Sequence, residues 1–527
     1  MAKKRQVSNA YSTPSDEGVI RAAPPNSGSD VGIWVLAATI IGSSMAFIDG
    51  TVVNVALPVL QEDLNASVSQ VQWIVESYAL FLAALILVGG SLGDHFGRRR
   101  IFTIGIIVFT IASVWAGFSP TAEQLIYARA VQGIGGALLV PSSLAVISAS
   151  FSESERGRAI GTWSGFTAIT TALGPVLGGW LVENVSWRWV FFINVPLAII
   201  TLLILFWKVP ESKDEEGARK LDWPGAVAVT IGLGCLVFGL IESSNYGLFH
   251  PLVIGTIIVG VIGLVAFMVI ETRSSAPMMP LNLFQSRTFS GANLLTLFLY
   301  SALSGTLFFL PFNLIQVQGY TATQAGAAFL PFILIMFALS RWAGSLIDRY
   351  GARLPLIIGP IIAGVGFAMF AIPGIGGTYW TTFFPAIVVL GFGMTVSVSP
   401  LTTAVMSSVE VRHSGIASGI NNAVSRTAGL IAIAILGIVA LALFNNALDS
   451  HLTPLNLTPE VEQAIDQERI KLAGAQIPEI VPTDLQPTIE QAIAESFVFS
   501  FRIIMLIGAG LAVLSAGMAF VLIETHE

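Results

Sequence analysis

The stretch that decides the fold is Gly89-Gly-Ser-Leu-Gly-Asp94-His-Phe-Gly97-Arg98-Arg99-Arg100, which lies between two long apolar runs. A shorter copy, Gly344-Ser-Leu-Ile-Asp348-Arg-Tyr-Gly351-Ala-Arg353, recurs in the second half of the chain. Both copies place Gly, Ser, Leu, Asp, Gly and Arg at matching spacing. A charged turn between two membrane-length helices, present twice, indicates a duplicated polytopic membrane protein.

The composition is that of a chain whose solvent is mostly lipid. Of its 527 residues, 54% are hydrophobic and only 11% are charged, whereas a soluble domain carries about 25% charged residues. The net charge of -7 does not indicate a class of partner, because the charges lie in loops and must be counted on each side of the membrane. The single cysteine, Cys235, excludes an intrachain disulfide and a thiolate metal cluster.

Fourteen apolar runs are long enough to cross a bilayer, which takes roughly 20 residues in a helix. The sequence therefore predicts an all-α polytopic protein with fourteen transmembrane helices. The predicted spans are 33–60, 70–92, 101–118, 122–148, 158–183, 187–208, 222–243, 251–271, 288–315, 324–347, 354–374, 379–406, 413–444 and 498–523.

Lysine and arginine alternate between the two sides of these spans. The short loops after odd-numbered spans, such as 61–69, 119–124 and 316–323, have none, with Arg188 as an exception, and the long segment 445–496 after span 13 holds Arg469 and Lys471. The loops after even-numbered spans hold Arg98, Arg99, Arg100, Arg156, Arg158, Lys208, Lys213, Arg219, Lys220, Arg273, Arg287, Arg349, Arg353 and Arg412. The positive-inside rule then places both termini in the cytoplasm.

The repeat gives the domain organisation. Asp94 closes the second span and Asp348 the tenth, so two extra helices separate two six-helix halves in a 6+2+6 arrangement. We expect a disordered cytoplasmic tail at 1–32, a first half at 33–208, two linking helices at 209–287 and a second half at 288–527. The acidic segment 445–496 is expected outside the membrane with short helices, either as a cation-attracting vestibule or as a solvated loop.

Four motifs resemble those of one transporter family. They are Ile48-Asp49-Gly-Thr51-Val-Val-Asn54-Val-Ala56-Leu-Pro58 in span 1, the Gly89–Arg100 turn, Arg129-Ala-Val-Gln132-Gly133-Ile-Gly135-Gly136 in span 4 and Gly174-Pro175-Val-Leu-Gly178-Gly179 in span 5. Together with Leu221-Asp222-Trp223-Pro224-Gly225 before span 7, they are similar to the fourteen-helix drug:proton antiporter branch of the major facilitator superfamily. The resemblance covers about residues 33–523.

The resemblance implies a major facilitator fold and export of amphipathic drugs or toxic small molecules by alternating access. The energy source would be the proton gradient, with no cofactor, no metal and no enzymatic activity. No nucleotide-binding Gly-rich loop with its lysine is present in the sequence, which argues against ATP-driven pumping.

The charged turns are candidates for a conformational gate. An acid at a helix end can pair with a nearby arginine or cap a neighbouring helix, and such contacts can hold one of two states. The gate candidates are Asp94, Gly97, Arg98, Asp348 and Arg353. The alternative for Arg98 and its neighbours is a purely topological role.

Three charged residues inside the spans are candidates for proton coupling. Asp49, Glu76 and Arg129 each stand in an otherwise apolar run, and charges at such positions tend to face the bundle interior or water. Arginine cannot release a proton, so Arg129 would act on a nearby carboxylate. The alternatives are a structural ion pair for Arg129 and a packing hydrogen bond from Asp49 to Thr51 or Asn54.

The span 5 motif removes side chains from one helix face. Gly174, Gly178 and Gly179, with Pro175 among them, allow close packing of a neighbouring helix. Spacing alone supports a contact that moves during transport and static packing equally. The resemblance to the antiporter motif favours the moving contact.

The substrate cavity is the least determined part of the sequence. Candidates are Glu76, Tyr78, Asn421, Asn422 and Arg426, the last three on a polar stripe in span 13. Glu76 stands where family members commonly carry an uncharged residue, which suggests a cationic substrate, whereas the lack of an acid in the span 13 stripe weakens that suggestion.

Two other functions stay open: a dedicated exporter of one endogenous metabolite and a non-transporting membrane receptor or scaffold. Expected partners are an amphipathic small molecule, protons and membrane lipids, with no nucleic acid. If the source cell has two membranes, a periplasmic adaptor is a further candidate partner. The expected location is the cell membrane.

Overall fold

The computed structural model describes residues 30–212, 222–274, 277–409 and 414–524, apart from some side chains within helices. Throughout these residues the ordered elements are helices and no strand occurs. Within the described residues, fourteen helical segments are long and apolar enough to cross a membrane, which confirms the predicted number of spans. The expected tail at 1–32 lies almost entirely outside the described residues.

The first half consists of α1 (Asp30–Asp63), α2 (Val68–Phe96), α3 (Arg98–Phe118), α4 (Ala122–Ser150), α5 (Glu153–Asn184), α6 (Trp189–Phe192) and α7 (Asn194–Lys208). Spans 1 to 5 are single helices, and span 6 is divided between α6 and α7. Within this half, α4 packs between α2 and α3, and α1 packs against α5 and α7.

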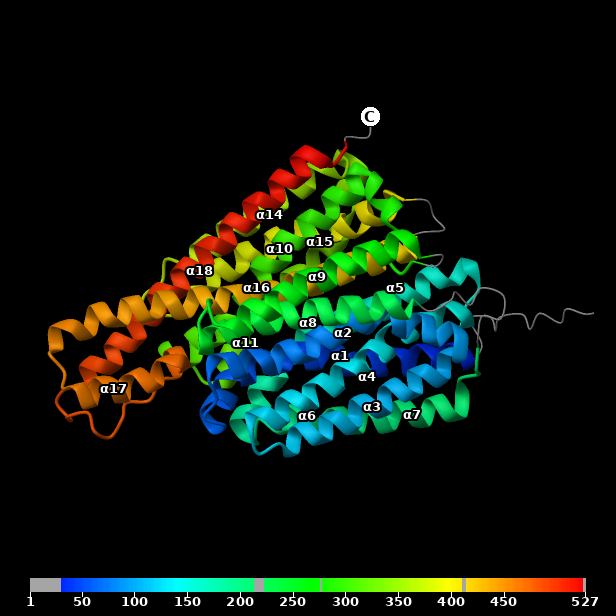
Figure 1. Cartoon of the computed structure of the whole chain (residues 1–527). Coiled ribbons are helices and arrows are strands. Elements are labelled where there is room, and N and C mark those ends of the chain that lie inside the picture. Colours follow the sequence, from blue (N-terminus) through cyan, green and yellow to red (C-terminus); the bar gives the residue numbers. More distant parts are fainter. Residues whose placement is uncertain (1–29, 213–221, 275–276, 410–413, 525–527) are drawn as a thin grey trace, which may run out of the picture.

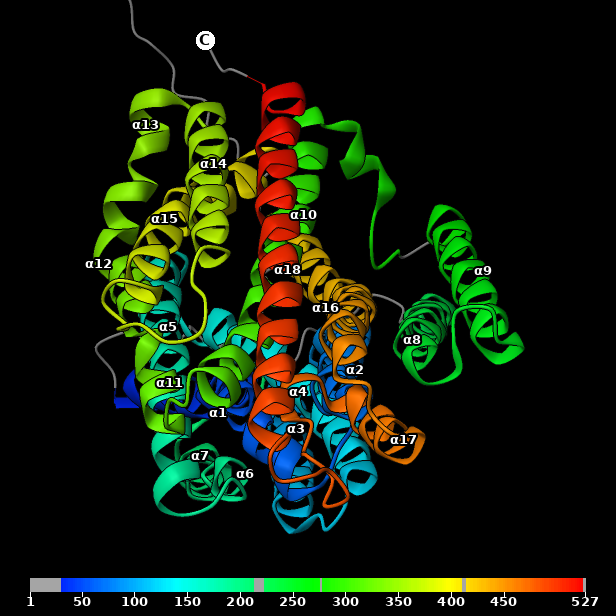
Figure 2. The same cartoon turned by 90° about the vertical axis from the view of Figure 1, so that its left-hand side faces the viewer.

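The linking pair consists of α8 (Trp223–Tyr246) and α9 (Pro251–Arg273), followed by the short η1 (Leu281–Gln285). Helix α8 packs against α9, against α2 of the first half and against α16 of the second half. Viewed from the end that carries α17, the pair stands at one side of the molecule (Figure 2). The linking pair therefore contacts both halves without separating them.

The second half consists of α10 (Arg287–Phe312) with the π-helical turn η2 (Asn313–Val317), α11 (Ala322–Ala328), α12 (Leu330–Gly344), α13 (Leu346–Tyr350), α14 (Arg353–Phe370), α15 (Phe383–Ser407), α16 (Ser414–Leu452), η4 (Thr453–Leu455), α17 (Pro459–Glu468), η5 (Arg469–Gly474) and α18 (Gln486–Leu522). Span 10, Ala322–Gly344, is divided between α11 and α12, and α13 follows it.

The acidic segment expected as an outer loop at 445–496 contains the three short helices η4, α17 and η5. Its ends belong to long helices, because α16 continues to Leu452 and α18 begins at Gln486. The last helix starts earlier than the sequence predicts, since its first turns are amphipathic and bury Ile489 and Ile493 instead of being uniformly apolar.

The two halves meet at the end that carries the loops after odd-numbered spans, which we call the predicted outer end. There α5 packs against α11, and Gln61 of α1 donates to the carbonyl of Lys471 at 3.1 Å and accepts from Gln316 at 3.0 Å. Toward the opposite end, α14 and α18 rise away from the first half (Figure 1). The halves are therefore joined at the predicted outer end and diverge at the other.

Arg188, the basic residue at odds with the predicted charge pattern, has a local counter-ion. Its guanidinium lies 3.3 Å from the carboxylate of Asp63 and over the ring of Trp187, whose indole also donates to Asp63 at 2.7 Å. The positive charge is therefore balanced where it stands.

Candidate functional site

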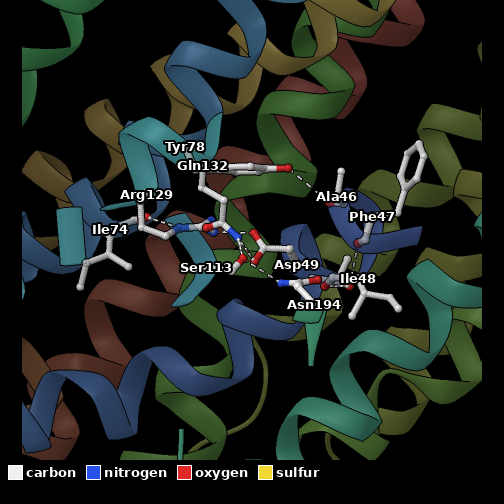
Figure 3. Close-up of polar contacts among 11 residues, drawn as sticks. Ala46, Phe47, Ile48, Asp49, Ile74, Tyr78, Ser113, Arg129, Gln132 and Asn194 are labelled. Carbon is white, nitrogen blue, oxygen red and sulfur yellow. Dashed lines mark hydrogen bonds and ion pairs between the residues drawn. The ribbon is translucent and has the colours of Figure 1, made fainter. Parts of the chain in front are cut away.

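A buried ion pair joins α1 to α4 inside the first half (Figure 3). Arg129 of α4 donates from Nη1 to Oδ2 of Asp49 in α1, and both residues are almost completely excluded from solvent. Because the desolvation of two charges is costly, such a pair is stable only with good geometry and further hydrogen bonds. The surrounding residues supply those bonds.

Gln132 forms hydrogen bonds with both members of the ion pair. It accepts from Nη1 of Arg129 at 2.7 Å and donates to Oδ1 of Asp49 at 2.8 Å. Its amide also donates to Ser113 of α3 at 2.7 Å, and Asn194 of α7 donates to the same hydroxyl at 3.2 Å. A continuous polar network thus crosses α1, α3, α4 and α7 in the apolar interior.

The guanidinium of Arg129 has two further contacts. Its Nε donates to the backbone carbonyl of Ile74 in α2 at 3.0 Å, and its Cζ lies 4.3 Å from the centre of the Tyr78 ring. A cation over an aromatic face is stabilised by about 2 kcal/mol or more when both are desolvated. Arg129 is therefore held by α2 as well as by Asp49.

Thr51, considered from sequence as a partner of Asp49, bonds elsewhere. Its hydroxyl lies within hydrogen-bonding distance of the carbonyls of Phe47, Ile48 and Thr171. The carboxylate of Asp49 is instead bound by Arg129 and Gln132.

A cavity of about 300 Å³ lies between the two halves next to this network. A volume of this size suits a small ligand. Among the residues that line it are Glu76, Tyr78 and Arg129 from the first half and Tyr300, Asn422 and Arg426 from the second half. Residues from both halves thus face one space, as a site between moving halves requires.

Glu76 is the most unusual group in this cavity. Its side chain is fully buried, and neither carboxylate oxygen has a hydrogen-bond partner in the structure. Arg129, which lines the same cavity, is bonded to Asp49 instead. A buried polar group without a partner is costly, so Glu76 is the candidate in this site for binding a proton or a cationic ligand.

Asn421, the remaining cavity candidate, is not among the residues lining this space. Its amide donates to Thr296 at 2.7 Å and to Asn293 at 3.2 Å, both in α10. It therefore joins α16 to α10 within the second half.

The glycines of the span 5 motif lie where α5 meets two other helices. A Cβ on Gly174 or Gly178 would come within 2.5 Å of Thr51 or Val52 in α1. A Cβ on Gly179 would lie 2.2 Å from the carbonyl oxygen of Ala322, at the start of α11 in the other half. In the same way, a Cβ on Gly326 of α11 would lie 2.1 Å from the carbonyl oxygen of Pro175 in α5. The motif therefore brings two backbones from opposite halves into direct contact.

Each of the two charged turns has a glycine with a positive φ angle. Gly97 has a φ of 109° between α2 and α3, and Gly351 has a φ of 69° before α14, a region that favours glycine. Arg353 donates to the carbonyl of Phe520 and lies over its ring, which ties α14 to α18. The side chains of Asp94 and Asp348 lie outside the described part of the structure.

At the first turn, the start of α3 is capped by a residue that sequence reasoning did not single out. The carboxylate of Glu211 accepts from the backbone amides of Arg99 and Arg100 at 2.9 and 3.1 Å, while the amide of Arg98 donates to the carbonyl of Ser212 at 2.8 Å. A negative charge at a helix N-terminus is stabilising. The segment after α7 thus closes this turn.

Gln132, Ser113 and Asn194 were also missed as site residues. Gln132 stands three residues after Arg129, so the two share a helix face, and this spacing was the available signal. Ser113 and Asn194 are isolated polar residues in apolar helices, and nothing in their local sequence indicates which helix they face.

Two helical bundles with a cavity between them, and a buried ion pair inside the first bundle, define a membrane transporter of the two-half type. The family model of the Major Facilitator Superfamily matches residues 39–433 of the chain. The chain belongs to this superfamily and is a multi-pass membrane protein related to drug-efflux transporters.

Several curated relatives are similar over most of their length. The multidrug resistance protein Stp of Mycobacterium tuberculosis is 34% identical over 80% of this chain and 78% of that protein. The tetracenomycin C resistance and export protein of Streptomyces glaucescens is 29% identical over 94% of this chain and 93% of that protein. The puromycin resistance protein pur8 of Streptomyces alboniger is 34% identical over 77% and 81%.

Solved structures agree on the fold. A bacterial homologue of the human lysosomal transporter Spinster, described as inward-facing and unoccupied, aligns with a TM-score of 0.63 at 18% identity, over 94% of this chain and 98% of that chain. The fold expectation from the two charged turns is therefore confirmed.

Proposed function

We propose that the chain is a proton-coupled exporter of amphipathic small molecules that works by alternating access in the cell membrane. The single observation that carries the proposal is the buried Asp49–Arg129 pair beside a cavity that both halves line. The names of the similar proteins, which refer to resistance and export, support drugs or toxic compounds as the substrate class.

The ion pair supplies a chemical basis for coupling. In the resting pair, the negative charge of Asp49 compensates the guanidinium of Arg129. A proton that binds Asp49 neutralises the carboxyl group and leaves Arg129 without its counter-ion, which changes the electrostatic balance between α1 and α4. A ligand shifts a conformational equilibrium only when it binds the two states with different affinity. The loss of the counter-ion of Arg129 is the step through which a bound proton favours one of the two conformations.

Movement of the halves would occur around the contacts at the predicted outer end. The backbone contacts of Gly179 and Gly326 hold α5 against α11 when that end is closed. The gate assigned to Asp94, Gly97, Arg98, Asp348 and Arg353 would act at the opposite end. The positive-inside rule places that end, with both termini, in the cytoplasm.

The proposal is tested with purified protein in proteoliposomes under an imposed pH gradient, screened with cationic and neutral dyes and with antibiotics that include puromycin. We expect substrate to accumulate against its own concentration gradient, in the direction opposite to proton flow. This accumulation should stop when a protonophore collapses the pH gradient. Transport of only one endogenous compound would favour a dedicated metabolite exporter. An absence of movement of every compound, with correctly inserted protein, would favour a receptor or scaffold.

A further inference from the structure

Two buried carboxyl groups lie at the base of the linking pair, away from the cavity between the halves. Asp222 precedes α8, and its Oδ1 accepts from the amide of Gly225 at 2.9 Å. Glu271 stands in the last turn of α9, and its Oε2 accepts from the amide of Met279 at 2.9 Å. The two residues are 9% and 3% exposed, so each carboxyl group has one oxygen bound to the backbone in a site that is almost closed to solvent.

The second oxygens of the two groups both lie beside Gly225. Oδ2 of Asp222 and Oε1 of Glu271 have no hydrogen-bond partner in the structure. They lie 3.0 and 3.1 Å from the position that a Cβ on Gly225 would occupy. The absence of a side chain at Gly225 therefore leaves room for both free oxygens next to its backbone.

The described residues around Gly225 supply no compensating positive charge, and Arg219 and Lys220, which precede Asp222 in the chain, lie outside the described residues. The segment 277–285, which connects α9 to α10, has no charged residue. Arg273 follows on α9 with its side chain exposed, and Glu242 lies at the other end of α8, bonded to Trp73. Within the described residues, two ionised carboxylates would therefore share one buried site, and like charges in such a site resist joint ionisation.

A metal ion fits this arrangement poorly. Ca²⁺ takes six to eight oxygen ligands, whereas only two free oxygens are present here, and the described residues contain no group of three or more His, Cys, Asp or Glu side chains that could hold a metal. A single proton satisfies both oxygens at once, because a protonated carboxyl group donates and its ionised neighbour accepts.

We propose that Asp222 and Glu271 form a proton-binding pair that shares one proton between Oδ2 and Oε1. The pair joins the start of α8 to the end of α9, and through Met279 it holds the segment that leads into the second half. Loss of the proton leaves two carboxylates in repulsion and loosens this junction. The site is separate from the transport path, so the proposal stands or fails independently of proton-coupled export.

The test uses the full chain in lipid and infrared spectroscopy of the protonated carboxyl stretch, identified by its shift in heavy water. All samples carry Glu76→Gln, which removes the other buried unpartnered carboxyl group. We expect a protonated-carboxyl band at neutral pH that is lost in Asp222→Asn and in Glu271→Gln, because the new amide donates a hydrogen bond to the remaining carboxylate. Glu242→Gln, on the same linking pair, is the matched control and should leave the band unchanged.

Persistence of the band in both variants would overturn the proposal, and its loss in only one would contradict a shared proton. A second measurement checks the structural consequence with the single cysteine, Cys235 in α8. At alkaline pH, maleimide should label Cys235 several-fold faster in the wild type than in Glu271→Gln, and at acidic pH the two rates should agree. Equal rates at every pH would contradict a junction that loosens when the proton leaves.

Discussion

At the scale of single residues, Arg129 is the point at which several interactions meet. It contacts Asp49 and Gln132 through hydrogen bonds, the carbonyl of Ile74 and the ring of Tyr78. Removing one member of a buried ion pair typically costs about 3–5 kcal/mol, because the other charge is left uncompensated. The proposed role of Arg129 in coupling must therefore be separated from its role in stability.

We expect Arg129→Ala to abolish gradient-driven export. Because Arg129→Ala leaves Asp49 without its counter-ion, a second variant is needed for comparison. The double variant Asp49→Asn/Arg129→Gln removes both charges and keeps amide groups for hydrogen bonding. The double variant should insert normally and let substrate equilibrate across the membrane without accumulating it. Transport assays with and without a pH gradient distinguish the two outcomes, and undiminished accumulation in the double variant would refute the coupling role.

Glu76 gives a second prediction at this scale. Its ionised carboxylate attracts a cation, and a proton on it removes that attraction. Export of cationic compounds should therefore fall as the cytoplasmic side is acidified. Glu76→Gln should reduce export of cationic compounds about tenfold or more, which corresponds to roughly 1.4 kcal/mol, while neutral compounds change little. Equal losses for both substrate classes would show that Glu76 does not select for charge.

At the scale of elements, the contact between α5 and α11 depends on the lack of a side chain at Gly179. An added methyl group would meet a backbone carbonyl at 2.2 Å, so one of the helices must shift. Forcing extra volume into a packed contact costs about 1–3 kcal/mol. This energy is enough to change the balance between two conformations of a transporter by about five- to 150-fold.

We expect Gly179→Ala to open the predicted outer end. Gln316, which bonds to Gln61 across the halves, can be replaced by cysteine in a Cys235→Ala background and labelled with a membrane-impermeant reagent. Labelling should be about tenfold faster with Gly179→Ala than without it. Gly165→Ala on the same helix is the control, since a Cβ there meets nothing within 4 Å. Equal labelling with both alanine variants would rule out the proposed seal.

At the scale of the whole molecule, the two halves are joined at one end and diverge at the other (Figure 1). One polar contact between them at the predicted outer end is the bond from the amide of Thr323 to the carboxylate of Glu183, at 3.1 Å. If alternating access is the mechanism, this contact must break in every cycle.

A covalent link at this position should therefore stop transport. In a Cys235→Ala background, the pair Glu183→Cys/Thr323→Cys should form a disulfide under oxidation, lose at least about nine-tenths of its export activity and recover it after reduction. The single variant Glu183→Cys should keep its activity under oxidation. Continued export by the crosslinked protein would contradict separation of the halves at this end.

The number of spans and their order were open to prediction because they depend on local properties. Each span needs about 20 apolar residues to satisfy its backbone in lipid, and the repeated turn around Asp94 and Asp348 marks the duplication. The breaks in spans 6 and 10 and the early start of α18 were not predictable in this way, because they depend on which neighbour each turn packs against.

The sequence by itself determined the fourteen-helix class, the two halves and the presence of three charged residues where lipid-facing placement is costly. Only the tertiary structure decided how these charges are used. Asp49 and Arg129 are far apart in the chain, and their pairing requires α1 and α4 to pack at one particular rotation. For the same reason Glu76 stays unpartnered, and Asp222 and Glu271 both lie beside Gly225. Hydrophobic length is a property of each helix alone, whereas the partner of a buried charge is set by the rotation and depth of two helices packed together.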